Sequence, residues 1–272
     1  MGKRQILLTN DDGIRSPGLW AAAEVLSDLG FVTVAAPREQ SSGMGRNLPS
    51  TSDGRIQAEV VNVCGKDWTV HAVGGSPGQA VLHGILEIMP QPPDLVVSGI
   101  NYGENVGTGI TVSGTVGAAL EAASHGIPAL AISLETATEN HFTYSKEIDF
   151  SAAAYFAAYF ASQMLAKRFP ADVNLLKVDV PSDASRQTSW EVTRVAHQRY
   201  YVPTPPERKS WDEPGRIGYK EAAVLDNERE NSDVYVLRVK QRVSVTPLSL
   251  DLTSRVDLEE IHRLLASRVN TL

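Results

Sequence analysis

The stretch ILLTNDDGI, residues 6–14, indicates the fold of this chain more directly than any other segment. It begins with continuous apolar residues, which are typical of a strand buried on both faces of a parallel sheet. The run ends on Asn10 and two adjacent carboxylates, Asp11 and Asp12, with Gly13 directly after them. Neighbouring carboxylates repel each other, and burying them costs free energy unless a cation or hydrogen-bond donors compensate. A solvated turn, a salt bridge or a metal ion is therefore expected at this strand end.

Strand and helix patterns alternate along the first two-thirds of the chain. We expect strands over residues 5–9, 31–36, 94–99, 128–134 and 173–180, with a hairpin formed by 58–63 and 68–73. Helices are expected over residues 17–30, 76–89, 113–126 and 150–166. This alternation predicts an α/β fold with a Rossmann-like, mostly parallel sheet and helices on both faces. Right-handed crossovers then bring the carboxyl ends of the strands to one edge, where ligands bind in such folds.

The pattern changes near residue 198. Four prolines between residues 203 and 214 predict an irregular arm. Residues 233–253 have the alternation of two strands, which predicts a hairpin or an added sheet edge, and a final helix is expected over 258–269. We therefore expect a core of residues 1–197 and a C-terminal extension of residues 198–272 with a β-hairpin and a helix. The extension either joins subunits or covers the sheet within one chain.

Composition and charge narrow the classes of function. The formal net charge of −7 argues against binding of a nucleic acid polymer, which needs clustered Lys and Arg. Cys64 is the only cysteine, so an intrachain disulfide and a cysteine-built zinc site are ruled out. The N-terminal residues contain no apolar segment typical of a signal peptide. The longest uncharged run, residues 150–166, falls below the roughly 20 residues of a membrane span. We expect a soluble cytoplasmic protein with no membrane contact.

Polar residues follow several of the expected strands. The loop after the second strand contains Ser41 and Ser42, and the glycine-rich segment after residue 98 contains Asn101 and Asn105. Carboxylate, hydroxyl and amide oxygens together form a hard ligand set that suits Mg²⁺ or Mn²⁺. Each of these serines and asparagines, taken alone, is more often a turn residue than a ligand. Together with the adjacent aspartates they predict a divalent metal site.

A second signal is the expected helix start at Ser113, Gly114 and Thr115. The free N–H groups and the dipole of a helix N-terminus favour an anion. Serine-capped helices are common, so this motif is weak by itself. Beside a divalent cation it predicts a phosphate-binding site.

Other chemistries match the sequence less well. GINYG has the spacing of a nucleophile elbow, but Asn101 stands where the nucleophilic serine would be. Neither a Walker A motif nor H-E-x-x-H is present. A receiver-like phosphate- and metal-binding module also has paired acids after its first strand, but the middle strand offers Ser98 and Asn101 instead of a phospho-accepting aspartate. An aspartyl-phosphate phosphatase needs Asp-x-Asp, which Asp11-Asp12-Gly13 does not provide.

Five motifs in order, LLTNDDGI, AAPREQSSG, VVSGINYGENVG, VSGTVGAALEAASHGIPALAISL and SVTPLSLDLT, resemble the SurE family over nearly the whole chain. Members of that family are metal-dependent 5'(3')-nucleotidases. The resemblance implies one divalent metal ion held by Asp11, Asp12, Ser42 and Asn101. It also implies a Rossmann-like fold whose C-terminal extension serves dimer or tetramer assembly.

The expected reaction is hydrolysis of nucleoside 5'- and 3'-monophosphates, with short polyphosphate as a further candidate substrate. We expect a water molecule to attack directly, with Asp11 or Asp12 as its proton acceptor. The phosphate is expected to bind at Asn10, Asn105 and residues 113–115.

The chain departs from the family pattern at three places. Arg38 follows Pro37 directly, where the family has an acidic residue between them, and residues 75–81 read GSPGQAV instead of a sequence like GTPADCV. The late strand LLKVDVP carries Lys177 and Asp179, where the family sequence resembles LNVNVP. None of these changes removes a metal ligand. The second and third bear on substrate choice or loop conformation.

Overall fold

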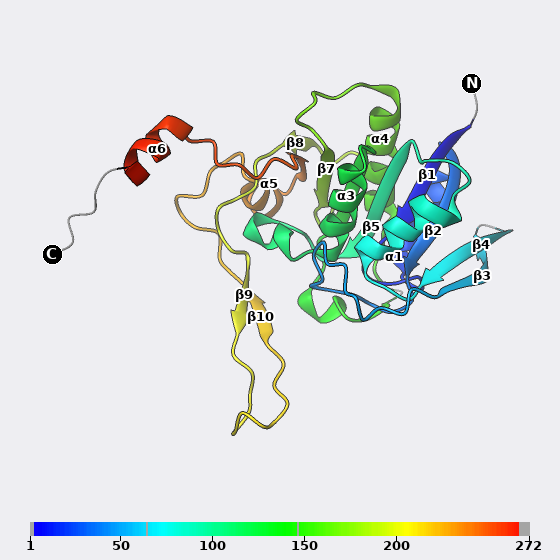
Figure 1. Cartoon of the computed structure of the whole chain (residues 1–272), viewed down its shortest axis with the longest axis horizontal. Coiled ribbons are helices and arrows are strands. Elements are labelled where there is room, and N and C mark those ends of the chain that lie inside the picture. The colour runs from blue at the N-terminus through cyan, green and yellow to red at the C-terminus, as the bar shows by residue number, and fades with distance from the viewer. Residues whose placement is uncertain (1–2, 64, 146, 267–272) are drawn as a thin grey trace.

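The computed structural model describes residues 3–63, 65–145 and 147–266, which form a large twisted sheet with helices packed on it (Figure 1). Within these residues the main sheet has nine strands. Their order is β3 (Ile56–Val63), β4 (Lys66–Val73), β2 (Gly30–Pro37), β1 (Arg4–Thr9), β5 (Leu95–Tyr102), β6 (Ala129–Leu134), β7 (Leu175–Val180), β11 (Val243–Leu248) and β8 (Trp190–Val192). Neighbouring strands from β4 to β7 are parallel, while β3 runs antiparallel to β4 and β11 antiparallel to β7. The predicted α/β class with a mostly parallel sheet is confirmed.

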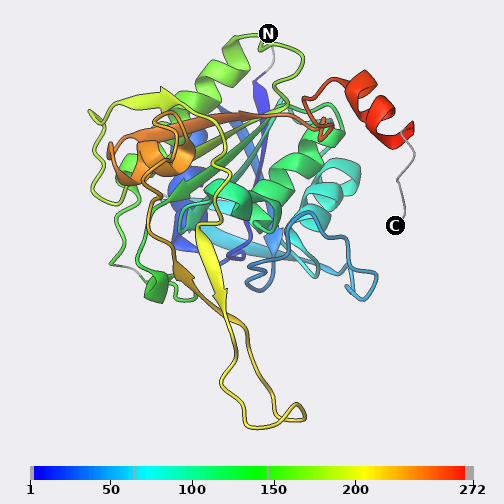
Figure 2. The ribbon, with the colours of Figure 1, turned by 90° about the vertical axis from the view of Figure 1, so that its left-hand side faces the viewer.

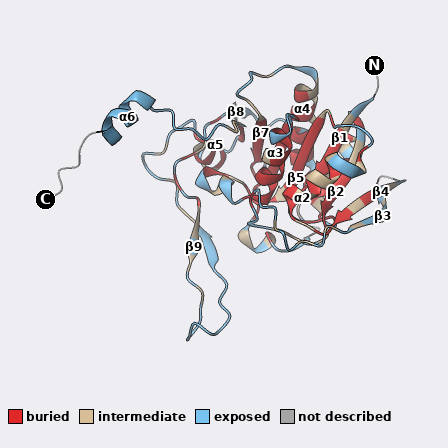
Figure 3. Ribbon diagram, viewed as in Figure 1, coloured by how far each residue is buried: buried red, intermediate tan, exposed pale blue. Residues whose placement is uncertain are grey.

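Apolar cores lie on both faces of this sheet, because successive side chains of a strand point to opposite faces. Ile6 and Leu8 of β1 pack in one core with α1 (Pro17–Leu26) and α4 (Ser151–Ala166). Leu7 belongs to the other core, with α2 (Pro77–His83) and α3 (Gly114–Ser124). Figure 3 shows the central strands and the covering helices as the buried part of the molecule. The continuous apolar run of residues 6–8 thus reflects burial of β1 from two sides.

Shorter elements complete the core region. A π-helical turn, η1 (Gly84–Ile88), continues α2, and two 3₁₀ helices follow β5 and β6 as η2 (Gly107–Thr111) and η3 (Thr138–Asn140). Within the described residues no helix is both long and apolar enough to cross a membrane.

The prediction of two strands over residues 233–253 is wrong for its first half. Residues 233–238 form the helix α5 (Asp233–Arg238). Ser232 caps the start of this helix, because its hydroxyl oxygen accepts a hydrogen bond from Tyr235 N at 3.1 Å. Val234 and Leu237, three residues apart, are buried in one small core beside the sheet. The alternating apolar residues of this segment therefore form a helix. The Ser232 cap and the burial of both Val234 and Leu237 on one helix face outweigh the β propensity of the segment. The second half forms β11, which lies inside the main sheet rather than at a hairpin.

The C-terminal hairpin exists, but at other residues. β9 (Tyr201–Thr204) and β10 (Gly218–Glu221) pair antiparallel in the segment that was expected to be irregular. Figures 1 and 2 show this hairpin projecting from the body of the molecule. The last helix, α6 (Leu258–Ala266), contains no buried residue; residues 267–269 of the expected helix lie outside the described residues. The boundary at residue 197 stays a prediction, and β11 shows that the later segment returns to the sheet.

Candidate active site

The carboxyl end of β1 lies at the edge of a cavity of about 320 Å³. Parallel pairing brings the ends of β1 and β5 together, as right-handed crossovers require. The loop after β2, the η2–α3 junction, residues 141–142 and the β9–β10 hairpin provide the other walls. The residues lining the cavity include Asp11, Ser42, Asn101, Glu104, Asn105, Ser113, His141, Phe142, Arg199, Tyr201, Ile217 and Tyr219. Five of the residues predicted from sequence therefore share one cavity: Asp11, Ser42, Asn101, Asn105 and Ser113.

Asp11 follows β1 and is buried against the first residues of helix α3. Its carboxylate oxygen Oδ1 accepts a hydrogen bond from the hydroxyl of Thr115. A Cβ atom on Gly114 would lie 2.6 Å from Cβ of Asp11, so the helix approaches this closely only because residue 114 is glycine. Burial raises the pKa of Asp11 despite these nearby donors. Gly114 and Thr115 thus hold the carboxylate at the cavity.

Asp12 is buried beside Asp11 but is not among the cavity-lining residues. Its Oδ2 accepts from the backbone N of Tyr102 at 3.2 Å, and its Oδ1 accepts from Nε2 of Gln40 at 3.3 Å. Burial first, and then the charge of Asp11, raises the pKa of Asp12 well above its ordinary value. These neutral donors offset only part of the cost of two adjacent buried carboxylates, so the pair suits a cation.

Asn101 and Ser42 complete the oxygen donors. Nδ2 of Asn101 donates to the carbonyl oxygens of Tyr102 and Gly103, at 3.2 and 2.6 Å, which leaves Oδ1 as the atom for a ligand. Ser42 is exposed and lines the same cavity. Among the described residues no group of three or more His, Cys, Asp or Glu side chains is placed to hold a metal ion. The two carboxylates of Asp11 and Asp12, with the neutral oxygens of Ser42 and Asn101, are a donor set that fits a hard divalent cation.

Asn10 is not among the cavity-lining residues. Its Nδ2 donates to the carbonyl oxygen of Gly13 at 3.0 Å, and its Oδ1 accepts from the N–H of Gly13 at 3.1 Å. Gly13 has φ = +98°, which favours glycine. Asn10 closes the turn that carries both aspartates, and its predicted contact with substrate stays a prediction.

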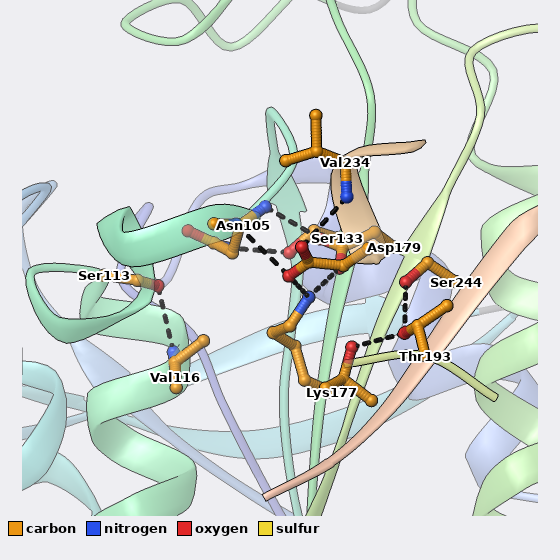
Figure 4. A network of polar contacts seen from close by, with 12 residues as sticks. Asn105, Ser113, Val116, Ser133, Lys177, Asp179, Thr193, Val234 and Ser244 are labelled. Carbon is orange, nitrogen blue, oxygen red and sulfur yellow. Dashed lines mark hydrogen bonds and ion pairs between the residues drawn. The ribbon is translucent and has the colours of Figure 1, made fainter. Parts of the chain in front are cut away.

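Ser113 and Asn105 lie where a phosphate would have to bind. The hydroxyl oxygen of Ser113 accepts from Val116 N at 3.0 Å and so caps α3. Asn105 donates from Nδ2 to Oγ of Ser133 at 2.8 Å, and from its backbone N to Oδ1 of Asp179 at 2.7 Å. Both side chains are therefore held by bonds to the protein (Figure 4).

A buried ion cluster lies behind Asn105, and sequence reasoning did not assemble it. Lys177 is fully buried and pairs with Asp179 (Figure 4). It also pairs with Asp233, at 3.2 Å from Nζ to Oδ2. Burial opposes the charge of Lys177, but the two carboxylates outweigh it and raise its pKa. Asp233 also accepts from the backbone N of Gly107, at 3.2 Å. The cluster thus joins β7, the loop around Asn105 and α5.

The sequence singled out Lys177 and Asp179 only as departures from a pattern. Charged residues at positions i and i+2 of an apolar strand point to the same face, which was the available signal for their pairing. Nothing local marked Asp233 as their partner.

Glu104 is a further buried acid on the cavity that the sequence did not single out. Burial, with the negative charges of Glu135 and Glu221, raises its pKa to about 7. Arg238 of α5 lies 3.9 Å from Oε1 of Glu104 and also pairs with both other glutamates. The signal in the sequence was only an acid within a glycine-rich loop.

Replacing Glu104 by glutamine is expected to stabilise the fold at alkaline pH. The pKa of Glu104 is higher in the folded protein than in the unfolded chain. Its contribution to the free energy of unfolding is therefore fully present below the unfolded pKa and is lost as the pH rises toward 7. The difference in unfolding free energy between E104Q and the wild type should therefore shift in favour of E104Q by about 2 kcal/mol between pH 5 and pH 8. Urea unfolding at both pH values measures this difference, and an equal effect at both would contradict the shift.

Comparisons with known proteins identify the family of this chain. The model of the family described as Survival protein SurE matches residues 6–202. A 5'-nucleotidase SurE from Thermococcus gammatolerans is 43% identical over 262 residues, which cover 96% of each chain. One from Archaeoglobus fulgidus is 42% identical over 257 residues, covering 94% of this chain and 95% of the relative.

A solved structure is similar throughout. The crystal structure of the SurE protein from Aquifex aeolicus has a TM-score of 0.73 and 33% identity, covering 96% of this chain and 99% of that one. This chain belongs to the SurE family.

Proposed function

We propose that this chain is a metal-dependent 5'-nucleotidase, which hydrolyses nucleoside monophosphates to nucleoside and phosphate. The observation that carries the proposal is the buried pair of Asp11 and Asp12, of which Asp11 lines one cavity together with Ser42 and Asn101. The relatives named 5'-nucleotidase SurE, which are 43% and 42% identical over nearly the whole chain, support the reaction. A non-catalytic receiver-like module is not favoured, since these relatives are named as enzymes.

One Mg²⁺ or Mn²⁺ ion would be held by Asp11, Asp12, Ser42 and Asn101, which present only oxygen atoms to a cation. A divalent cation supplies Lewis acidity, which stabilises negative charge on phosphate oxygens. In this proposal the carboxylates lie next to the reacting phosphate, and one of them accepts the proton of the attacking water. The cavity-lining residues offer no nucleophile with an adjacent base, so water attacks directly.

The remaining phosphate oxygens would bind at the N-terminus of α3 and at Asn105. Helix α3 has eleven residues, and the positive end of its dipole at Gly114 and Thr115 favours negative charge, of which the Asp11 carboxylate beside these two N–H groups is one source. Asn105 is oriented by Ser133 and Asp179, which reduces the reorganisation needed when charge builds in the transition state. Asn10 contributes by closing the turn that presents the two aspartates.

Removal of divalent metal tests the function. The purified chain should release phosphate from AMP with Mn²⁺ or Mg²⁺, and EDTA should lower the rate on the order of 100-fold or more. Excess Mn²⁺ should restore it. A panel of 3'-monophosphates and short polyphosphate, assayed the same way, defines the wider substrate range. Full activity in EDTA would contradict the proposal.

We further propose that the protein is a cytoplasmic homodimer or homotetramer that binds neither a nucleic acid polymer nor a membrane. Helix α6 supports a second copy as partner, since it has no buried residue and leaves Leu258 and Leu265 exposed. Its acidic first turn, Glu259 and Glu260, lies beside this apolar face. The net charge of −7 is unfavourable for a polymer of phosphates.

A further inference from the structure

Four ring side chains form one wall of the cavity and have no place in the phosphate chemistry. They are His141, Phe142, Tyr201 and Tyr219, here called the aromatic wall. The first two follow η3 in the core, and the last two belong to β9 and β10. The hairpin seen in Figure 2 thus supplies half of this wall.

The aromatic wall exposes apolar surface into the cavity. Phe142 is 62% exposed and Tyr219 is 36% exposed, and Ile217 beside them is 72% exposed. Exposed apolar side chains gathered at a cavity with a polar floor are typical of a binding site for an amphipathic ligand. Here the polar floor is formed by Asp11 and Asn101.

The rings are fixed relative to one another. Tyr219 lies nearly parallel to His141 at 6.1 Å between centroids, and meets Tyr201 edge-on at 5.3 Å and Phe142 at 6.4 Å. Hydrogen bonds from Ala222 N to Tyr200 O and from the Tyr200 hydroxyl to Glu221 close the base of the hairpin, and Tyr200 is buried in a small core with Val234. The wall is therefore preorganised, which lowers the entropy cost of stacking a ligand on it.

The polar atoms of His141 and Tyr219 are already hydrogen-bonded within the protein, and the hydroxyl of Tyr201 is buried without a hydrogen-bond partner among the described residues. Burial lowers the pKa of His141, so the ring is neutral near pH 7. Its Nε2 lies 3.3 Å from Thr136 O, and its Nδ1 lies 2.9 Å from the hydroxyl of Tyr219. Nε2 therefore carries the hydrogen, and Nδ1 accepts from the tyrosine. What the wall offers to a ligand is ring surface.

The wall is connected directly to the acid pair. Gln40 donates from Nε2 to the carbonyl oxygen of His141 at 2.7 Å and to Oδ1 of Asp12 at 3.3 Å. Gly103, with φ = +93°, packs against the same imidazole, where a Cβ would lie 2.4 Å from Nε2. One glutamine side chain thus separates the wall from the carboxylates. Phe142, Tyr219 and Asp11 line the same cavity, so the base and the phosphate of one nucleotide would both bind within it.

We infer that the aromatic wall binds the base of the nucleotide by stacking, mainly on Phe142 and Tyr219. This inference rests on the proposed nucleotidase function. Stacking on aromatic side chains recognises the flat face that every base has, and purines present the larger one. The wall therefore selects nucleotides over phosphate esters that lack a base.

The test compares AMP with ribose 5-phosphate, which lacks only the base. Phe142→Ala should lower the ratio of kcat/KM for AMP to kcat/KM for ribose 5-phosphate on the order of tenfold. F142Y keeps a ring and should keep the ratio. Trp211→Ala is the matched control, because Trp211 is an exposed aromatic residue of the β9–β10 connection outside the cavity lining. Tyr219→Ala should act as F142A does.

The outcomes separate this inference from the function on which it rests. An unchanged ratio in both F142A and Y219A, with both substrates hydrolysed, overturns base stacking and leaves the nucleotidase function standing. A wild type that hydrolyses neither substrate overturns the proposed function. Direct binding of adenosine, measured by titration calorimetry without turnover, then decides the inference: binding that is weakened in F142A supports it, and equal or absent binding overturns it.

Discussion

Replacing Asp11 by asparagine is expected to lower kcat/KM for AMP on the order of 1,000-fold, since several kcal/mol of charge stabilisation depend on this carboxylate. Asparagine has nearly the same shape and can still accept the hydrogen bond from Thr115. The fold should therefore be retained. Asp12→Asn should behave in the same way, because both carboxylates belong to the proposed cation site.

The same variants should not be less stable than the wild type when metal is removed. Two adjacent buried carboxylates repel each other, and substitution of either removes that repulsion. Thermal unfolding in EDTA measures this, while calorimetric titration with Mn²⁺ should show weaker binding than in the wild type. Loss of activity without loss of stability distinguishes a catalytic defect from unfolding.

Asp28→Asn is the matched control for this experiment. Asp28 is exposed just after α1 and is not among the cavity-lining residues, so its substitution should change neither activity nor Mn²⁺ binding. Activity of D11N or D12N within about tenfold of the wild type would contradict a role for the pair at the reacting phosphate.

Replacing Lys177 by methionine is expected to cost about 3–5 kcal/mol of unfolding free energy, because it leaves two carboxylates buried without their cation. Asp179 and Asp233 are both fully buried, and neither can turn to solvent. Urea unfolding followed by circular dichroism measures the loss. K167M, at an exposed lysine after α4, should cost less than about 0.5 kcal/mol and serves as the control.

The cause of this loss can be separated from simple loss of packing. The triple variant K177M/D179N/D233N keeps similar side-chain volumes but leaves no buried charge, so it should recover part of the stability of K177M. Asparagine at residue 179 can still accept from the backbone N of Asn105. If the triple variant is no more stable than K177M, unpaired charge is not the reason for the loss.

Much of the fold could be predicted because its signals are local. The apolar run before Asp11 predicts a strand buried on two faces, and Ser113 predicts the start of a helix; both predictions are confirmed. The alternation of strands and helices implies a parallel sheet, and in such sheets ligands bind at the carboxyl ends of the strands. The position of the cavity at the end of β1 follows from this rule. The sequence also placed Asp11, Ser42, Asn101, Asn105 and Ser113 in what the structure shows to be one cavity.

The predictions failed where long-range contacts decide the conformation. Residues 233–238 alternate like a strand but form a helix, because Val234 and Leu237 pack into a core that segments near residues 106 and 200 provide. The hairpin of β9 and β10 forms in a proline-rich segment whose local pattern indicates no strands.

The sequence by itself determined the parallel core, the acidic end of β1 and the oxygen-rich set around it, since apolar periodicity and strand order require only neighbouring residues and general rules of chain connection. Only the tertiary structure brought Asp233 to Lys177 and Tyr219 of the hairpin to Phe142. Those contacts join segments from 56 to 77 positions apart (233 − 177 and 219 − 142), and their free energy exists only once the sheet has placed both partners. No local pattern can therefore encode them.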